Sequence, residues 1–421
     1  MGMLPTFGGI SFGGPTYTAD FSSSVPADWT FTRASNGTYI DSAGILQTAS
    51  SNVARFPFDG NGVAKGLLVE NDATNLLLYS ADFTNNVSWV KTGGAITNPT
   101  ATNITGAANT NLFTEDTSTG VHSIYQSVVK AASNIFYSQS IYIKPNGRNR
   151  VLFRMEGTGG TNGIGADITL TGDGTVNSAA AFGSGFSNPV GRVEKLYNGW
   201  WRIYVGGTTN TDLVVTFVIY GLDSGGNSSY TGDGASGFYL YGAQLETSSF
   251  NMPTSYILTT TGSATRAREV VTTTPTWYVT NSNGSLYIEY YPNVFNPGTT
   301  GFLFQIDDNS NNNRHAFRVD TSNYQNYTQI TGGSTIFLTT NTSANAINRM
   351  NYSACSWADN NAAIVVNFQN SGIDLTGTKL AAALTNARLA STTNLSRANG
   401  CIRKVAYWSY KIPNQQLGFA L

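Results

Sequence analysis

The residue types that carry most enzyme chemistry are sparse in this sequence. It holds two histidines, His122 and His315, too few for a multi-histidine metal site and without the context of a serine–histidine–aspartate triad. Glycoside hydrolysis needs only two facing carboxylates. The candidate carboxylates fall in no recognisable constellation: Glu156, Glu194, Glu246 and Glu289. We therefore expect a protein without enzymatic activity, and a glycoside hydrolase is the remaining enzymatic alternative.

Aromatic residues offer a different chemistry, the binding of sugars. Trp200 and Trp201 are adjacent in an expected strand, so their side chains point to opposite faces. One ring is expected in the core, and the other is a candidate for exposure at the surface, where an aromatic face stacks on sugar C–H groups. With Tyr230 and Tyr239 they form the candidate carbohydrate-binding set. Packing of the rings against neighbouring strands is the alternative.

Calcium and a disulfide are the two structural cross-links that the sequence offers. Asp307, Asp308 and Asn309 open a run of the oxygen ligands that Ca²⁺ prefers, and a polar hairpin tip is the alternative. Cys355 and Cys401 lie on expected strands of the C-terminal part. They form either a disulfide or two buried free thiols. Apart from structural calcium, we expect no cofactor.

The composition separates this chain from several protein classes. Charged residues make up 11% of its 421 residues and the net charge is −1, so no basic field attracts nucleic acid. No apolar run is long enough to insert into a membrane. The uncharged, aromatic-rich composition is typical of extracellular β proteins, yet we recognise no export signal at the N-terminus. A virus particle assembled in the host cytoplasm resolves this contradiction, and a bacterial protein secreted by another route is the rival explanation.

The first residues resemble a docking arm more than a strand or a helix. Residues 1–19 are rich in glycine, which disfavours a helix, and they carry apolar side chains without periodicity. A free flexible arm would not need Leu4, Phe7, Ile10 and Phe12. We expect these four residues to order against a partner, with terminal disorder as the alternative.

The rest of the chain reads as short strands separated by Gly, Asn and Asp turns. We predict an all-β fold, with two antiparallel β-sandwiches (jelly rolls) in tandem behind the short arm. The expected divisions are an N-terminal β segment at 20–73, with packing against the C-terminal sandwich as one option, a first sandwich at 74–258 and a second at 259–421. Two short sequence similarities, which we call echoes, connect distant parts of the chain. The sequence of residues 32–34 recurs at 265–267, and residues 66–70 resemble residues 242–246. We expect the segments that flank the first sandwich to pack beside each other.

Several of these stretches are similar to a known group of proteins. Residues 74–77, followed by Asp82, Phe83 and Trp89 and closed by residues 239–246, resemble the carbohydrate-binding-module jelly rolls of tailed-bacteriophage virion proteins. Residues 253–257 and 265–267 are similar to the linker of those proteins. The C-terminal part, with strands at 286–289 and 400–407, looks like a concanavalin A-like lectin domain. Related modules often carry an acidic pair that holds calcium where this chain has Tyr241-Gly242.

The resemblance implies a role in a particle. It suggests a structural component of a tailed phage (fibre, spike, collar or head-decoration subunit) that contacts host surface polysaccharide and other virion proteins. It also implies a location in the virion and a homo-oligomer, with a trimer as the usual fibre state. The alternatives are a polysaccharide depolymerase and a secreted bacterial sugar-binding adhesin.

Overall fold

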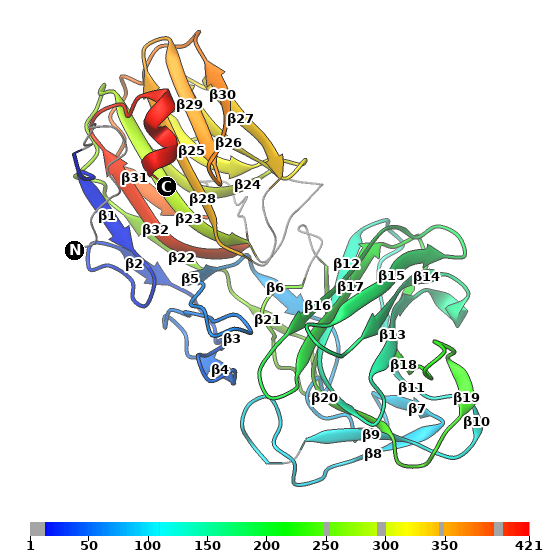
Figure 1. Cartoon of the computed structure of the whole chain (residues 1–421). Helices are drawn as coiled ribbons and strands as arrows, with labels where there is room; N and C mark the ends of the chain where they lie inside the picture. The colour runs from blue at the N-terminus through cyan, green and yellow to red at the C-terminus, as the bar shows by residue number, and fades with distance from the viewer. Residues whose placement is uncertain are drawn as a thin grey trace. The chain divides into compact units, whose positions relative to one another are not determined.

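The computed structural model describes residues 13–108, 110–247, 253–292, 300–344, 349–390 and 399–420 (Figure 1). Regular structure in these residues is strand, apart from two 3-10 helices, η1 (Thr158–Gly160) and η2 (Asn414–Ala420). The prediction of an all-β chain with antiparallel sheets is therefore confirmed. The chain forms two compact units, and we call residues 32–65 and 70–269 the first unit. The second unit combines residues 13–31, 66–69 and 270–420.

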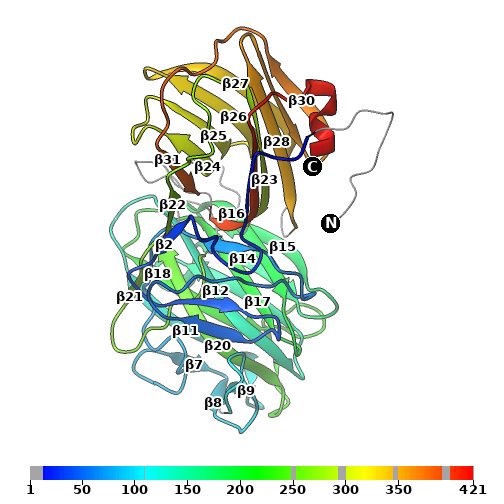
Figure 2. The same ribbon diagram turned by 90° about the vertical axis from the view of Figure 1, so that its left-hand side faces the viewer.

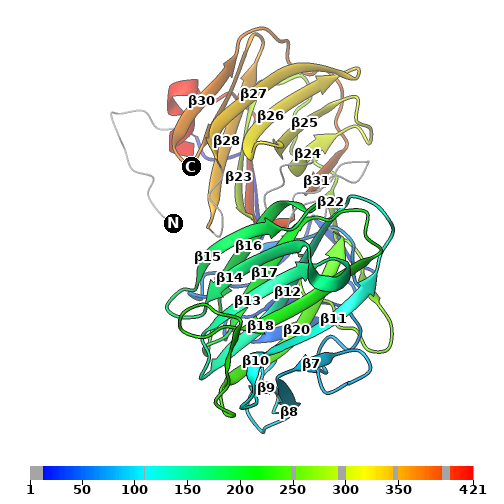
Figure 3. The ribbon, with the colours of Figure 1, turned by 90° about the vertical axis from the view of Figure 1, so that its right-hand side faces the viewer.

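The first unit is built on two six-stranded antiparallel sheets. Figure 3 shows strands β15, β14, β13 and β18 of one sheet side by side. That sheet has the order β15 (Thr175–Phe182), β14 (Gly163–Thr169), β13 (Arg150–Glu156), β18 (Val214–Gly221), β11 (Ser123–Val129) and β7 (Val90–Thr92). The other has the order β16 (Ser187–Lys195), β17 (Trp201–Thr208), β12 (Phe136–Asn146), β20 (Gly237–Thr247), β9 (Asn111–Glu115) and β8 (Gly94–Thr97).

The two sheets enclose one hydrophobic core, and strand alternation decides which residues enter it. In β13, Val151, Phe153 and Met155 are fully buried, whereas Leu152 and Arg154 between them are partly exposed. Phe217 of β18 meets the Phe153 ring edge-on at 5.0 Å between centroids. In β13 one set of side chains therefore faces the core and the other set faces away from it.

Three small antiparallel pairs complete the first unit. They are β3 (Gly37–Ile40) with β4 (Leu46–Ala49), β6 (Ala73–Asn75) with β21 (Ala264–Arg266), and β10 (Thr119–Val121) with β19 (Ser229–Thr231). In the second pair Ala73 lies opposite Arg266 and Asn75 opposite Ala264. The segments on either side of the first sandwich thus lie beside each other, as their echoing sequences predict.

The second unit is also a sandwich, of two seven-stranded sheets (Figure 2). One has the order β1 (Tyr17–Asp20), β32 (Gly400–Trp408), β23 (Gly284–Pro292), β28 (Asn351–Ala358), β29 (Asn361–Val366) and β30 (Gln369–Asp374), and β5 (Leu67–Val69) also pairs with β32. The other has the order β2 (Thr30–Thr32), β22 (Val270–Thr273), β31 (Asn386–Leu389), β24 (Gly301–Asp307), β25 (Arg314–Val319), β26 (Tyr324–Thr331) and β27 (Ser334–Ala344).

The interior of the second sandwich is filled by stacked aromatic rings. His315 of β25 stacks on Trp357 of β28 at 4.4 Å between centroids, which joins the two sheets. Its ring nitrogens are bonded to the hydroxyls of Tyr327 at 2.7 Å and Tyr278 at 3.0 Å. Burial lowers the pKa of His315 to about 3, so this ring is neutral at ordinary pH.

The outward face of the sheet that contains β28 is partly covered by the end of the chain. Ile412 and Leu417, before and within η2, are buried against Tyr287, Ala363 and Trp408 of that sheet. Figures 1 and 2 place η2 beside β28 and β29. The C-terminal residues therefore serve as a cap on an otherwise exposed apolar face.

Candidate functional site

The tryptophan pair does not offer a stacking surface. Trp200 is 2% exposed and packs with Leu46 and Tyr142, so the β3–β4 hairpin covers it. Trp201 is 8% exposed and lies in the core between the two sheets. The two side chains do point to opposite faces, but both faces are covered. The expectation of one exposed tryptophan is wrong, because sequence alternation reveals the face of a strand and not the segment that packs over it.

The two tyrosines of the predicted set lie in different places. Tyr239 is partly buried beside the cluster that holds Trp200. Tyr230 of β19 is 9% exposed, and its hydroxyl donates to Glu115 at 2.8 Å. The guanidinium of Arg148 lies 4.6 Å from the centre of the Tyr230 ring. The four residues therefore do not form one surface, although Trp200 and Tyr239 share a cluster.

The aspartates of the calcium candidate are already engaged by protein groups. The Asp307 carboxylate accepts hydrogen bonds from Arg388 Nε at 2.9 Å and from the Asn309 amide at 2.8 Å. Asp308 accepts from Ser310 and from Asn313 Nδ2 at 2.7 Å. In the described part of the chain no cluster of three or more His, Cys, Asp or Glu residues could hold a metal ion. The geometry is that of the alternative interpretation, a polar hairpin tip.

The two cysteines are free and buried. Cys355 lies opposite Leu286 on one side of β23, and Cys401 lies opposite Tyr291 on the other side. A whole strand therefore separates the two thiols. The prediction of a disulfide is wrong because β28 and β32 are not neighbours, and the alternative of two buried thiols is confirmed. The docking residues Leu4, Phe7, Ile10 and Phe12 lie outside the described residues.

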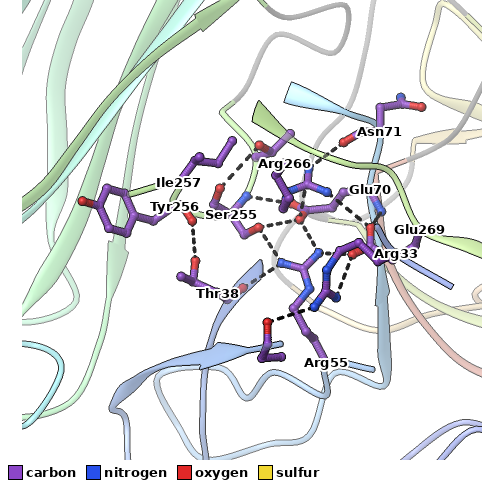
Figure 4. Close-up of polar contacts among 12 residues, drawn as sticks. Arg33, Thr38, Arg55, Glu70, Asn71, Ser255, Tyr256, Ile257, Arg266 and Glu269 are labelled. Atoms are coloured by element: carbon purple, nitrogen blue, oxygen red, sulfur yellow. Dashed lines mark hydrogen bonds and ion pairs between the residues drawn. The ribbon is translucent and has the colours of Figure 1, made fainter. Parts of the chain in front are cut away.

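The echoing sequences meet in a buried ionic network, which Figure 4 shows in close-up. The Arg55 side chain is fully buried, and its guanidinium contacts Glu269 at 2.6 Å and Glu70 at 2.8 Å. Arg33 and Arg266, the arginines of the two echoes, reach Glu269 at 3.3 and 3.4 Å. These five residues, which we call the arginine–glutamate network, join four separate segments of the first unit.

Backbone and hydroxyl groups complete this network. Arg55 also donates to the Thr38 carbonyl at 2.7 Å, and Ser255 donates through its amide and its hydroxyl to Glu70 at 2.8 and 2.6 Å. Burial alone would raise the pKa of Glu70, but Arg266, Arg55 and the Ser255 bonds hold it at about 2. Burial raises the pKa of neighbouring Glu246 to about 7, against hydrogen bonds from Thr254. All five network side chains are at most 2% exposed, which marks them as structural.

The face of the β13 sheet that points away from the core carries aromatic and polar groups. Because Val151, Phe153 and Met155 point into the core, the alternate residues of β13 face outward. Tyr220 lies opposite Leu152, and Val218 lies between Arg154 and Tyr125 in neighbouring strands. We call this surface the tyrosine face. Its partly exposed residues are Tyr125, Leu152, Arg154 and Tyr220, and it also includes the buried residues Glu156 and Val218, which are 6% and 2% exposed.

The rings and charges of the tyrosine face are held in fixed positions. The Tyr220 hydroxyl donates to Glu156 Oε1 at 3.0 Å. The Arg154 guanidinium lies 4.4 Å from the centre of the Phe182 ring and 5.5 Å from that of Tyr220. Burial raises the pKa of Glu156, while the bonds from Tyr220 and Arg154 oppose that rise. Tyr125, Arg154 and Tyr220 remain partly exposed, whereas the Glu156 carboxyl group next to Tyr220 is buried.

A hollow lies next to this face at the edge of the sandwich, between β7 and β8. It has a volume of about 560 Å³, and Val90, one of its lining residues, lies opposite Tyr125. The Lys91 ammonium donates to Asn86 Oδ1 at 2.7 Å on the wall of the hollow. The remaining lining residues are Thr84, Trp89, Gly94, Ala95 and Ile96. The hollow, which we call the edge hollow, thus combines aliphatic walls with amide, ammonium and hydroxyl groups.

The sequence carries one signal for the tyrosine face, the alternation of apolar and polar residues along its strands. In β13 and β11 the apolar positions alternate with Arg154, Glu156 and Tyr125, so the outward set could be assigned by parity. The sequence could not predict that β18 lies between β13 and β11 in the sheet, because β18 is distant from both strands in the sequence.

Comparisons with known proteins give only distant structural similarity. No protein-family profile and no curated protein matches this chain. The CBM40 module of Ruminococcus gnavus IT-sialidase, bound to alpha2,3 sialyllactose, matches at a TM-score of 0.30 and 12% identity over 34% of this chain and 83% of its own. Mouse laminin alpha1 domains LG4-5 match at 0.24 and 10% over 70% and 92%. Trypanosoma rangeli sialidase with the inhibitor DANA matches at 0.29 and 8% over 89% and 74%. These scores are too low to support an argument about this chain.

Proposed function

We propose that this chain is a structural component of a tailed-phage particle that binds host surface polysaccharide through the tyrosine face and has no enzymatic activity. The observation that carries the glycan part is the pair of partly exposed tyrosine rings, Tyr125 and Tyr220, beside Arg154 and Glu156. The virion part is supported by the low charge and high aromatic content of the sequence and by its resemblance to virion proteins.

The chemistry of the tyrosine face suits a sugar chain. Pyranose rings present C–H groups on one side, which pack on an aromatic ring, and hydroxyls at the rim, which bond to charged side chains. Tyr220 is fixed by its bond to Glu156, so little conformational entropy is lost when a sugar binds. The edge hollow extends the surface with Asn86 and Lys91. A single contact of this kind is weak, and many copies on one particle would multiply it into avidity.

Binding to a panel of purified bacterial surface polysaccharides tests the glycan part. Tyr220→Ala removes the ring and should weaken binding about fivefold, since aromatic contacts are worth about 1 kcal/mol. Tyr220→Phe keeps the ring and should retain binding. Tyr324→Ala, the same change at a partly exposed tyrosine of the second sandwich, is the matched control. Equal binding by Tyr220→Ala and the control would remove the tyrosine face from the proposal.

One observation favours polysaccharide depolymerisation as a second candidate. The raised pKa of Glu156 is a property of a general acid, and this carboxyl group lies on the face proposed for the sugar. Release of oligosaccharides from a bound polysaccharide, abolished by Glu156→Gln, would establish the enzyme and overturn the non-enzymatic proposal. Immunogold labelling of particles tests the virion location, against secretion by a bacterium.

A further inference from the structure

The second sandwich carries two arginines whose charges are not balanced by a neighbouring carboxylate. In β25 the side chains of His315 and Phe317 are buried in the core, so Arg314 and Arg318 point away from it. Within the described part of the chain neither guanidinium forms an ion pair, and Arg314 donates to a neutral group, Asn311 Oδ1, at 2.7 Å. Arg318 has no hydrogen bond there, and its Nε atom is buried. We call these two residues the arginine pair.

The two side chains of the arginine pair lean towards each other. The Arg314 guanidinium lies 5.1 Å from the centre of the Phe302 ring, and Phe302 lies opposite Arg318 in the neighbouring strand β24. Residues 314 and 318 are about 13 Å apart along an extended strand, so Arg314 must extend towards Arg318 to reach that ring. Ala316, between them on the same face, is too small to hold them apart. Burial and the charge of Arg318 both lower the pKa of Arg314, so the two cations repel each other.

The carboxylates nearest to the arginine pair are engaged by other groups. Asp307 lies opposite Arg314, but it forms its ion pair with Arg388, whose Nε atom is 2.9 Å away. Asp320 follows β25 and accepts a hydrogen bond from Asn326 Nδ2 at 3.0 Å. The positive charge of the arginine pair is therefore left over on this face. A partly buried charge without a partner is costly, and it points to an anion as the missing partner.

We propose that the arginine pair binds the carboxylate group of an acidic sugar. Two forked guanidinium groups match the paired oxygens of a carboxylate, and they lose their water more easily than an ammonium group does. An anion between the two arginines also offsets their mutual repulsion. That the sugar belongs to a host surface polysaccharide rests on the proposed function, whereas the anion site itself does not. The arginine pair lies in the second sandwich and the tyrosine face in the first, so either site can fail without the other.

Calorimetric titration of the full chain with trigalacturonate, an acidic trisaccharide, tests the binding. The full chain should bind trigalacturonate and should not bind maltotriose, an uncharged trisaccharide. Arg318→Gln should weaken binding about tenfold, because it removes charge-assisted hydrogen bonds. Arg349→Gln, the same change at an exposed arginine of the second sandwich, is the matched control and should bind as the full chain does. Tyr220→Ala should also bind normally, which separates this site from the tyrosine face.

Thermal unfolding separates a binding role of Arg318 from a structural one. Without ligand, Arg318→Met should leave the melting temperature of the second sandwich unchanged or raise it, because the variant lacks an unpaired charge. Trigalacturonate should raise the melting temperature of the full chain and not that of Arg318→Met. A lower melting temperature of Arg318→Met without ligand would make the arginine structural and overturn the proposal. Equal binding by Arg318→Gln and Arg349→Gln would also overturn it, as would binding of sodium sulfate without binding of trigalacturonate.

Discussion

Removal of Arg55 gives the most direct test of the reasoning about the first unit. Its guanidinium contacts Glu269 at 2.6 Å, Glu70 at 2.8 Å, Ser255 at 2.6 Å and the Thr38 carbonyl at 2.7 Å, and the side chain is fully buried. Breaking a buried ion pair typically costs about 3–5 kcal/mol, because the partner charge stays buried without compensation. We expect the free energy of unfolding of the first unit to fall by this amount in Arg55→Met.

The charge balance predicts an order among the variants. Without Arg55, two arginines still face Glu70 and Glu269, so Arg55→Met should lie near the lower end of that range. Glu269→Gln removes the acceptor shared by all three arginines and should cost more. The double variant should cost less than the sum of the single changes, because the two residues contact each other.

Urea unfolding followed by hydrogen-exchange mass spectrometry reads the two units separately. Arg150→Met is the matched control. Arg150 forms a 2.6 Å ion pair with Asp167, but the two side chains are 26% and 18% exposed. This change should cost about 1 kcal/mol or less, as surface ion pairs do. Equal losses in Arg55→Met and Arg150→Met would refute the assignment of stability to the buried network.

Four further predictions concern acid unfolding, thiol reactivity and a buried tryptophan ring. The pKa of Glu70 is depressed to about 2, so its contribution of about 3 kcal/mol to the free energy of unfolding of the first unit should be lost as pH falls from about 4.5 towards 2. In Glu70→Gln the stability of the first unit should depend less on pH in this range. The pKa of His315 is lowered to about 3, so about 5 kcal/mol of the free energy of unfolding of the second sandwich should be lost as pH falls from 6.5 to 3. The second sandwich should therefore unfold before the first in acid, and His315→Gln should move its unfolding to lower pH. Cys355 and Cys401 should react with a thiol reagent only after unfolding, and any lack of reaction in urea would indicate a disulfide. Trp200→Ala should cost about 3–5 kcal/mol of stability and leave polysaccharide binding by the folded protein unchanged.

The fold class could be read from the sequence because it depends on local patterns. Residues 349–354 and 362–367 predict a hairpin that closes at 359–361, and the structure has β28 and β29 there. Alternating apolar positions and Gly, Asn and Asp turns are properties of a few neighbouring residues. Such signals do not depend on which strands become neighbours in space.

The site could be predicted only in part, because it depends on contacts between distant segments. The sequence makes one ring of the Trp200–Trp201 pair a candidate for exposure, but Leu46, more than a hundred residues earlier in the chain, packs against Trp200. The sequence allows a disulfide between Cys355 and Cys401, but in the structure β23 lies between their strands. Conversely, the repeated Thr-Arg-Ala sequences at 32–34 and 265–267 did report a long-range contact, since Arg33 and Arg266 both reach Glu269.

The position of the arginine–glutamate network gives it a mechanical consequence. The chain enters the first sandwich after Glu70 and leaves it before Glu269, and the antiparallel β6–β21 pair holds these two ends together. A force applied to both ends would separate this pair from its Glu70–Glu269 end, where Arg266 spans the two glutamates. When the two strands are pulled apart from one end, their contacts break one after another. The strength of the first contact therefore sets the force needed to separate the pair. Charged contacts buried among four segments at this point are therefore better placed to resist separation than the same contacts within the core.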